Sequence, residues 1–171
     1  MDTFYEQLIT IKKTSSKIAL LLGIWILAAL ICILLVFVIS FFIGSLTFLA
    51  VFGVLFGTYK LCGQFNIEYE YIITNGTLDI DKIINKKSRK RILSLELSKV
   101  TRLEKYKEGV TANINPKDLT VACNKTESDT YFLVAEKSNS GSYNLIFAPN
   151  ERMREAIAKF VPKFISNSAF K

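Results

Sequence analysis

The most prominent feature of the sequence is a long apolar stretch near the N-terminus. No charged residue occurs at positions 18–59. As one helix, this stretch would be about 60 Å long, twice the roughly 30 Å hydrocarbon core of a bilayer. A run at 40–45 that contains Gly44 and two serines interrupts the otherwise Leu-, Ile-, Val- and Phe-rich sequence. The pattern therefore predicts two membrane-spanning helices, at about 18–39 and 44–62.

The charges beside this stretch predict its orientation. Lys12, Lys13 and Lys17 precede it, Lys60 follows it, and the connecting turn has no charge. Translocation of basic groups across a membrane is disfavoured. A signal peptide does not fit, because the apolar region of a signal peptide has about 7–15 residues and the uncharged stretch at 18–59 is far longer. We therefore expect a multi-pass protein of the cell membrane with both termini in the cytoplasm.

The anchor divides the chain into three expected parts. These are a cytoplasmic N-terminal segment (1–17), a transmembrane helical hairpin (18–62) and one soluble domain (63–171). The chain has 171 residues, so little more than one domain remains beyond the anchor. Its net charge of +7 suits an anionic leaflet, but it equally suits a cytoplasmic location.

Two glycines in the second predicted helix have the spacing of a packing motif. Gly53 and Gly57 form a GxxxG pair, which allows helix backbones to approach closely. Two interpretations are open: the pair forms a dimerisation face, or it packs against the first helix of the same hairpin near Ala28 and Ala29.

After residue 60 the apolar positions begin to alternate, as is typical of β-strands. One face of the first strand carries Ile67, Tyr69, Tyr71 and Ile73. Asn75-Gly76 supplies the positive-φ residues of a tight hairpin turn, and a return strand begins at Leu78. Further strands are expected at about 89–97, 101–107, 119–123, 130–136 and 143–147, which makes about seven.

The C-terminal region changes to helical spacing. Apolar residues recur at Met153, Ile157, Phe160, Val161 and Phe164. Asn150 is an expected N-cap, and Pro162 is expected to kink or shorten the end. This pattern predicts one helix that covers the core of a small barrel or sandwich.

Seven short antiparallel strands followed by a helix is the element order of pleckstrin-homology-like (PH-like) domains. The segments YIITNGTLDID and RKRILSLELSKV resemble the opening of bacterial PH-like domains that lie beside membrane helices. The matching features are Tyr71, the Asn75-Gly76 turn, the return strand Leu78 to Asp81, the basic Arg91 and the apolar segment Leu93 to Val100. The two N-terminal helices with this domain also resemble small membrane protein families of Gram-positive bacteria. The resemblance implies a membrane-anchored α+β fold, in which a transmembrane hairpin precedes a seven-stranded antiparallel barrel or sandwich with a C-terminal capping helix.

The sequence lacks the usual signatures of enzymes. It contains no histidine, which removes the commonest general base and the Ser-His-Asp and Cys-His arrangements. Neither GxGxxG nor GxxxxGK[ST] occurs, and the three cysteines show no CxxC spacing. Asp79 and Asp81 share one face of the return strand, where we expect solvated carboxylates. We therefore predict no catalytic residue, metal or cofactor.

One segment has a composition that suits recognition of anions. Positions 86–91 hold five basic residues: Lys86, Lys87, Arg89, Lys90 and Arg91. Near a bilayer each contributes on the order of 1 kcal/mol to binding of anionic headgroups, and the resemblance implies such a role for a basic hairpin. The alternative is a solvated hairpin tip. Nucleic-acid binding is not expected, because the cluster contains no aromatic residues for base stacking.

These features favour a non-enzymatic, membrane-tethered interaction module at the cytoplasmic face, which binds a protein partner or associates with itself. A domain that senses anionic lipids through the 86–91 cluster is one alternative. An accessory subunit of a larger membrane system is another.

Overall fold

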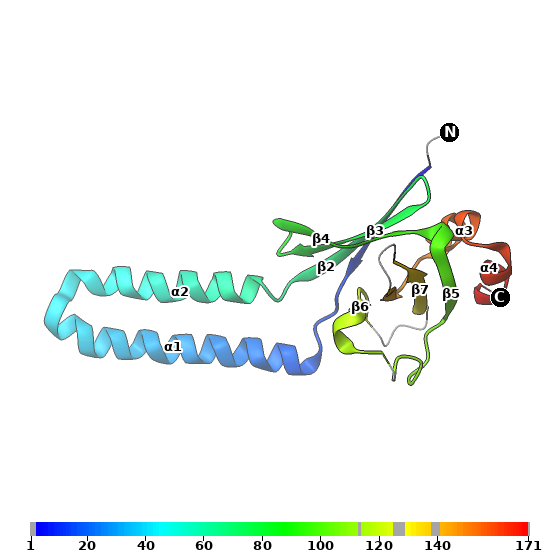
Figure 1. Cartoon of the computed structure of the whole chain (residues 1–171). Coiled ribbons are helices and arrows are strands. Elements are labelled where there is room, and N and C mark those ends of the chain that lie inside the picture. The colour runs from blue at the N-terminus through cyan, green and yellow to red at the C-terminus, as the bar shows by residue number, and fades with distance from the viewer. Residues whose placement is uncertain (1–2, 113, 125–128, 138–140, 171) are drawn as a thin grey trace. The chain divides into compact units, whose positions relative to one another are not determined.

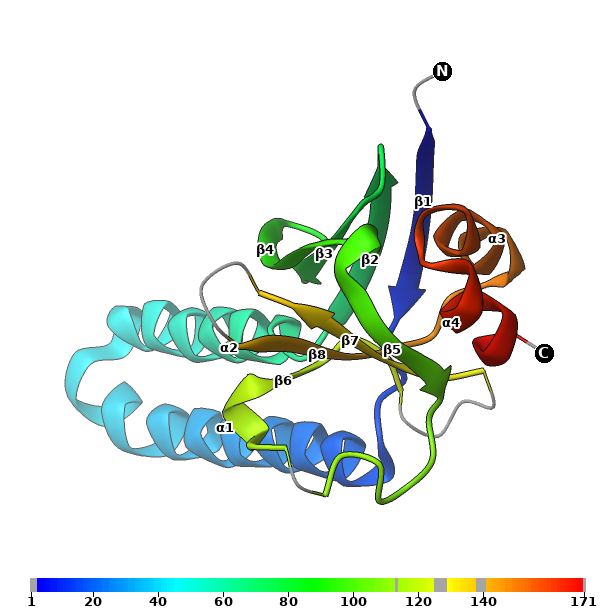
Figure 2. The same ribbon diagram turned by 45° about the vertical axis from the view of Figure 1, so that its right-hand side comes forward.

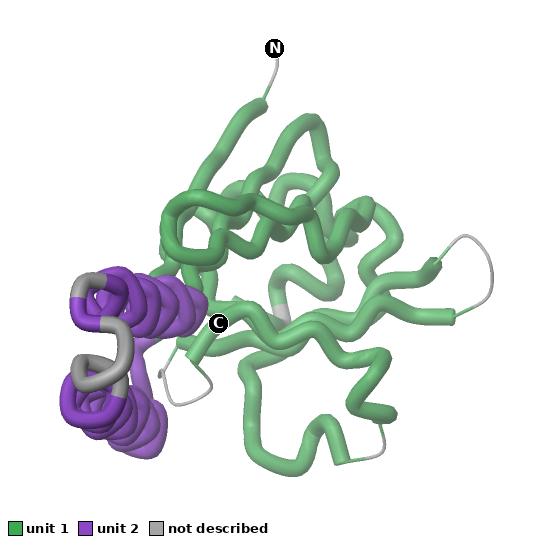
Figure 3. Tube along the Cα trace, turned by 90° about the vertical axis from the view of Figure 1, so that its left-hand side faces the viewer, with its two compact units in different colours: residues 1–11, 67–171 green, residues 12–66 purple. Residues whose placement is uncertain are grey.

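The computed structural model describes residues 3–112, 114–124, 129–137 and 141–170. The chain divides into two compact units, one of residues 1–11 and 67–171 and the other of residues 12–66 (Figure 3). The first unit is therefore assembled from two segments that the whole second unit separates in the sequence.

The second unit is a hairpin of two helices (Figure 1). Helix α1 spans Ser15–Ile43, the short 3-10 helix η1 spans Gly44–Leu46, and α2 spans Thr47–Gly63. The chain reverses at Gly44, which has a φ of 28°. The predicted break at 40–45 is confirmed, although α1 extends beyond its predicted end at residue 39.

The two helices contact each other along one side of each. Ala28 of α1 is 4% exposed, and Thr58 of α2 is also buried, with its hydroxyl donating to the Val54 carbonyl at 2.8 Å. Gly53 and Gly57 lie away from this contact, because a Cβ atom placed on either would meet no described atom within 4 Å. Packing of these glycines against α1, one of the two interpretations, is therefore wrong. Their role in dimerisation stays a prediction.

Helix α1 is apolar around its whole circumference. Its most apolar 18-residue window, within Ser15–Val38, has a mean hydropathy of 3.2, and only 6% of that window is buried. Such a helix is suited to an apolar surrounding. Within the described residues it is the one helix long and apolar enough to cross a membrane, and α2, with 17 residues, falls short of that length.

The first sheet is antiparallel, with the strand order β1-β2-β3-β4. Its last three strands are β2 (Ile67–Thr74), β3 (Thr77–Ile84) and β4 (Ser88–Glu96). The predicted turn between β2 and β3 is confirmed, since Asn75 and Gly76 have φ angles of 49° and 86°. A side chain at Gly76 would also crowd Phe160, whose ring would lie 3.1 Å from the added Cβ.

The edge strand β1 (Phe4–Thr10) is a difference from the sequence-based expectation. It pairs with β2, so that Phe4 lies opposite Thr74 and Thr10 opposite Glu68. Residues 1–17, expected as a separate segment, thus supply a strand to the domain that was expected to begin at residue 63. Apolar and polar residues alternate in this short segment, but the alternation does not indicate that its partner strand, β2, follows two apolar helices in the sequence.

The second sheet has the order β5-β7-β8-β6. Its strands are β5 (Val100–Lys105), β6 (Leu119–Val121), β7 (Tyr131–Glu136) and β8 (Ser142–Phe147). All seven predicted strands occur, but β1 joins the first sheet and β6 runs parallel to β8. The described strands consequently form two four-stranded sheets with a shared core (Figure 2). Of the two expected forms, barrel or sandwich, the barrel is not closed, and the expectation of seven strands that are all antiparallel is wrong.

Two helices end the chain: α3 (Glu151–Phe160) and α4 (Lys163–Ala169). The Asn150 side chain caps α3, as predicted, by accepting a hydrogen bond from the Met153 N–H at 2.8 Å. Pro162 ends the first helix and starts a second, where one helix was expected. Met153 and Ile157 are buried in the core, but Phe164 is 76% exposed and lies outside the predicted apolar stripe.

Tyr71 connects the two sheets at the centre of this core. It is fully buried, and its ring meets Phe147 edge-on with centroids 5.9 Å apart. Its hydroxyl donates to the Ala122 carbonyl at 2.7 Å and accepts from the Ala148 N–H at 3.3 Å. The tyrosine thus joins β2 to the residues that follow β6 and β8.

Candidate interaction surface on the first sheet

The first sheet has one face in the core and a second face that carries charged groups. Because side chains alternate along a strand, the strand registers place these residues together. We call this second face the outer face; its residues include Phe4, Glu6, Leu8 and Thr10 of β1, Glu68, Glu70 and Ile72 of β2, Asp79, Asp81 and Ile83 of β3, and Arg89 and Arg91 of β4.

Two arginines on β4 neutralise carboxylates on this face. Arg89 contacts Glu70, with Nη2 2.9 Å from Oε1. Arg91 contacts Asp79 and Asp81 at 2.8 and 2.9 Å, and the hydrogen bond to Asp81 raises the pKa of Arg91. Asp81 is only 4% exposed. The expectation that the two aspartates are solvated is therefore wrong, since Arg91 of the neighbouring strand β4 pairs with both of them.

The basic residues at 86–91 do not form one patch. Arg89 and Arg91 are held by carboxylates, whereas Lys90 lies between them on the strand and pairs in register with Lys82. By alternation Lys90 points to the other face. Lys86, with a φ of 56°, and Lys87 lie in the turn between β3 and β4. Only the two turn lysines therefore join the arginines on one side of the sheet.

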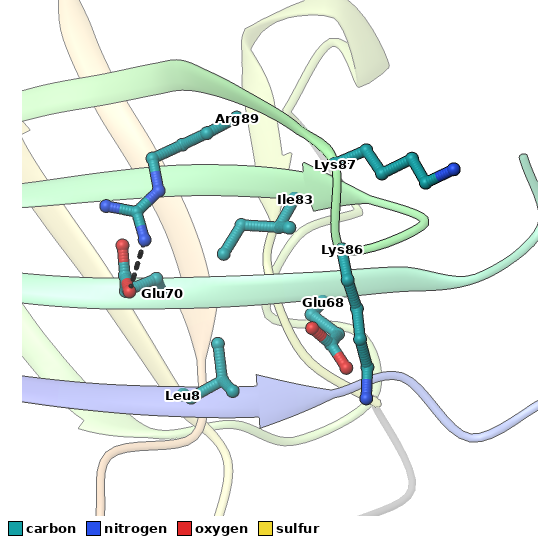
Figure 4. Close-up of a pocket in the computed structure, with 7 residues that line it drawn as sticks. All are labelled: Leu8, Glu68, Glu70, Ile83, Lys86, Lys87 and Arg89. Carbon is teal, nitrogen blue, oxygen red and sulfur yellow. Dashed lines mark hydrogen bonds and ion pairs between the residues drawn. The ribbon is translucent and has the colours of Figure 1, made fainter.

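A shallow groove of about 380 Å³ opens on the outer face (Figure 4). Its lining residues are Leu8, Glu68, Glu70, Ile83, Lys86, Lys87 and Arg89. Figure 4 shows Glu68 and the two turn lysines at one end, and the apolar side chains of Leu8 and Ile83 between the strands. The groove thus combines both signs of charge with an apolar floor.

Glu70 is an unusual residue for a strand surface, because it is only 3% exposed. Burial and the neighbouring Glu6 carboxyl group raise the pKa of Glu70, while Arg89 opposes this effect. Its Oε2 atom is shielded from solvent and receives no hydrogen bond from the residues that the structure describes. The carboxyl groups of Glu6 and Glu70 can form a hydrogen bond with each other only if one of them is protonated. When both are ionised, neither has a hydrogen-bond donor to offer the other.

Side chains hold β1 to the rest of the domain. The Gln7 amide donates to the Ala148 carbonyl at 3.0 Å and accepts from the Asn150 N–H at 2.9 Å. Lys159 of α3 donates to the Tyr5 hydroxyl at 3.0 Å. Neither Gln7 nor Tyr5 was singled out from the sequence, although the alternation within FYEQLIT was an available signal for a strand.

The arrangement is suited to binding through ion pairs and apolar contact. Across the described ranges no group of three or more His, Cys, Asp or Glu side chains is placed to hold a metal ion. The chain also contains no histidine.

Comparison with known proteins places these features in a family. No curated protein and no solved structure matches the chain. A family model described as "Bacterial PH-like domain (DUF6106)" matches residues 1–167. The match includes β1, the helical unit and both sheets, as well as nearly all of α4. The chain therefore belongs to this family of bacterial PH-like domains.

Proposed function

We propose that this protein is a membrane-tethered, non-enzymatic interaction module whose PH-like domain binds a protein partner, or a second copy of the chain, at the cytoplasmic face. The observation that carries the proposal is the pairing of β1 with β2, one strand before and one strand after the apolar helices. The domain and the anchor are thereby joined at two points of the chain.

This pairing constrains the topology of the anchor. The two ends of the segment 12–66 leave the domain side by side, because the Ile11 N–H donates to the Ile67 carbonyl at 3.1 Å. In the arrangement that we propose, both ends lie on the same side of the membrane, and this favours an even number of crossings. If α1 crosses, α2 is the returning span. Together η1 and α2 are on the order of 30 Å long, and the flanking lysines favour the cytoplasmic side.

The surface of the helices supports a membrane setting. Phe37 of α1 is 80% exposed and Phe48 of α2 is 84% exposed, together with many Leu, Ile and Val side chains. An exposed apolar surface of this extent needs an apolar surrounding. Lipid would cover the apolar surface of the helices. We therefore assign recognition of a soluble partner, or of a larger membrane system, to the PH-like domain.

Two experiments test the proposal. Reporter fusions at the N-terminus, at Gly44 and at the C-terminus should place both ends in the cytoplasm and the turn outside; opposite locations for the two ends would overturn the double crossing. The tagged full chain, extracted in mild detergent, should retain a defined protein partner or run as an oligomer in native mass spectrometry. A strictly monomeric chain without a partner would overturn the module.

A second candidate is binding of anionic headgroups. The observation that favours it is that Lys86 and Lys87 form no ion pair with any described residue. It predicts that in nanodiscs phosphatidylglycerol protects the amides of 85–87 from exchange, that salt removes this protection, and that the double variant Lys86→Glu, Lys87→Glu abolishes it. Equal protection in phosphatidylcholine nanodiscs would contradict this role.

A further inference from the structure

We propose that the open edge of β1 binds an extended segment of a partner protein, which adds a fifth strand to the first sheet and places a Lys or Arg side chain beside Glu6. This inference rests on the proposed function and names the surface that would carry it. Three features of β1 support this binding mode: its hydrogen-bond pattern, the exposure of its side chains, and the two neighbouring carboxyl groups of Glu6 and Glu70.

The ladder pattern identifies the backbone groups at this edge. The Asn75 N–H donates to the Thr3 carbonyl and the Ile11 N–H donates to the Ile67 carbonyl, at 3.2 and 3.1 Å. In an antiparallel pair, alternate residues bond to the partner strand. The odd-numbered residues of β1 therefore face β2. Phe4, Glu6, Leu8 and Thr10 direct their N–H and carbonyl groups to the open side.

The two edges of the first sheet differ in their protection. Sheet edges are usually protected by charged side chains, most often lysine, by proline or by a bulge. Strand β4 carries Arg89, Lys90 and Arg91, and its register with β3 shifts between Ile80 and Asp81. The segment FYEQLIT of β1 has no basic residue and no proline.

The side chains beside the β1 edge are also apolar and accessible. Phe4 is 61% exposed and Leu8 is 54% exposed. A long unprotected edge with such side chains is a template for another strand. The contrast with β4 indicates that β1, and not β4, is built to be covered.

The carboxyl pair specifies what the added strand should carry. Glu6 lies between Phe4 and Leu8 on the outer face, and its carboxyl group is within hydrogen-bonding reach of Glu70. Glu70 is already paired with Arg89 through Oε1, while Oε2 has no donor in the described part of the chain. A Lys or Arg opposite Glu6 would supply positive charge and donors there. Apolar residues two positions before and after it would contact Phe4 and Leu8.

A short peptide of this pattern, blocked at both ends, provides the probe: TVTKTVT, with TVTETVT as its charge control. The protein is the isotope-labelled full chain in nanodiscs. We expect TVTKTVT to slow amide hydrogen exchange at Glu6 and Leu8 and to leave Tyr5 and Gln7 unchanged, because only the former amides face the open edge. Protection of residues on β4 or α3 instead would overturn the proposal, as would no protection at millimolar peptide.

A charge exchange tests the role of Glu6. The variant Glu6→Lys should lower the affinity for TVTKTVT about fivefold and raise that for TVTETVT by a similar factor. Glu96→Lys, on the opposite edge of the sheet, is the matched control and should change neither affinity. An unchanged preference in Glu6→Lys would overturn the assignment of the basic residue to this position.

The same measurements separate the alternatives. Protection of Glu6 and Leu8 that grows with protein concentration in the absence of peptide would mean that a second copy covers the edge, which overturns the partner segment. If the Glu6→Lys variant binds a natural partner as strongly as the parent chain does, binding at the β1 edge is overturned, while the proposed function as an interaction module is retained. If the chain binds the peptide but is monomeric and recovers no partner, the proposed function as an interaction module is overturned, while binding of an extended segment at the β1 edge is retained.

Discussion

The Ile11 N–H and the Ile67 carbonyl are joined by a hydrogen bond of 3.1 Å, although the whole helical unit lies between the two residues in the sequence. This geometry predicts that the helices can be removed without loss of the domain. A chain in which Asn-Gly replaces residues 12–66 should form a two-residue hairpin between β1 and β2. We expect a soluble, cooperatively unfolding protein, measured by circular dichroism. The fragment 64–171, which lacks β1, is the control and should be unfolded or aggregated.

The Gln7 amide provides the second prediction. Gln7→Ala removes the hydrogen bonds to the Ala148 carbonyl and the Asn150 N–H, and should lower the free energy of unfolding by about 1–2 kcal/mol. Urea unfolding of the full chain in detergent, followed by near-ultraviolet circular dichroism, measures it. Thr10→Ala, an exposed change on the same strand, should have little effect. Equal stability of the two variants would show that β1 is held by its ladder alone.

Tyr71 is expected to matter through its hydroxyl as well as its ring. Tyr71→Phe keeps the edge-on contact with Phe147 but leaves the Ala122 carbonyl and the Ala148 N–H without their buried partner. The expected loss of stability is about 1–3 kcal/mol. Tyr143→Phe, at a half-buried tyrosine against the same core, should lose less. The melting temperatures of both variants and of the parent chain decide the comparison.

The burial of Glu70 makes the stability of the domain depend on pH. Burial and the nearby Glu6 raise the pKa of Glu70, so the folded state holds the proton more tightly than the unfolded chain does. This contribution is fully present below the usual glutamate pKa of about 4.3 and is lost as the pH rises through the raised value. Glu70→Gln should therefore gain melting temperature relative to the parent as the pH rises across this window. A constant difference between the two proteins would contradict a raised pKa.

The two kinds of basic residue in the 86–91 segment should respond differently to neutralisation. Arg91→Gln leaves Asp79 and the buried Asp81 without their cation and should lower the melting temperature. Lys87→Gln, in the turn, should leave it unchanged. Thermal unfolding of both variants at low and high salt makes the test, and equal effects would show that the arginine ion pairs add no stability.

The features predicted correctly are those that local chemistry determines. Asn75-Gly76 suits only a few turn geometries, Gly44 interrupts an apolar helix, and Asn150 is an N-cap with a helical apolar pattern behind it. Each of these depends on residues within a few positions of one another, so no distant partner is needed to predict it.

The features that were missed depend on neighbours distant in the sequence. The partner of β1 follows the helical hairpin, and the burial of Asp81 depends on an arginine of the next strand. The basic cluster also looked denser than it is, because counting residues along a strand ignores that Lys90 and Arg91 point to opposite faces.

The pairing of Phe4 with Thr74 imposes an order on biosynthesis. Strand β1 leaves the ribosome before β2, which is translated only after the helical hairpin. At about 5–20 residues per second the delay is roughly 3 to 12 s. During this time the first sheet cannot form. On the membrane topology that we propose, insertion of the helices therefore precedes folding of the domain, and β1 stays without its partner strand until insertion is complete.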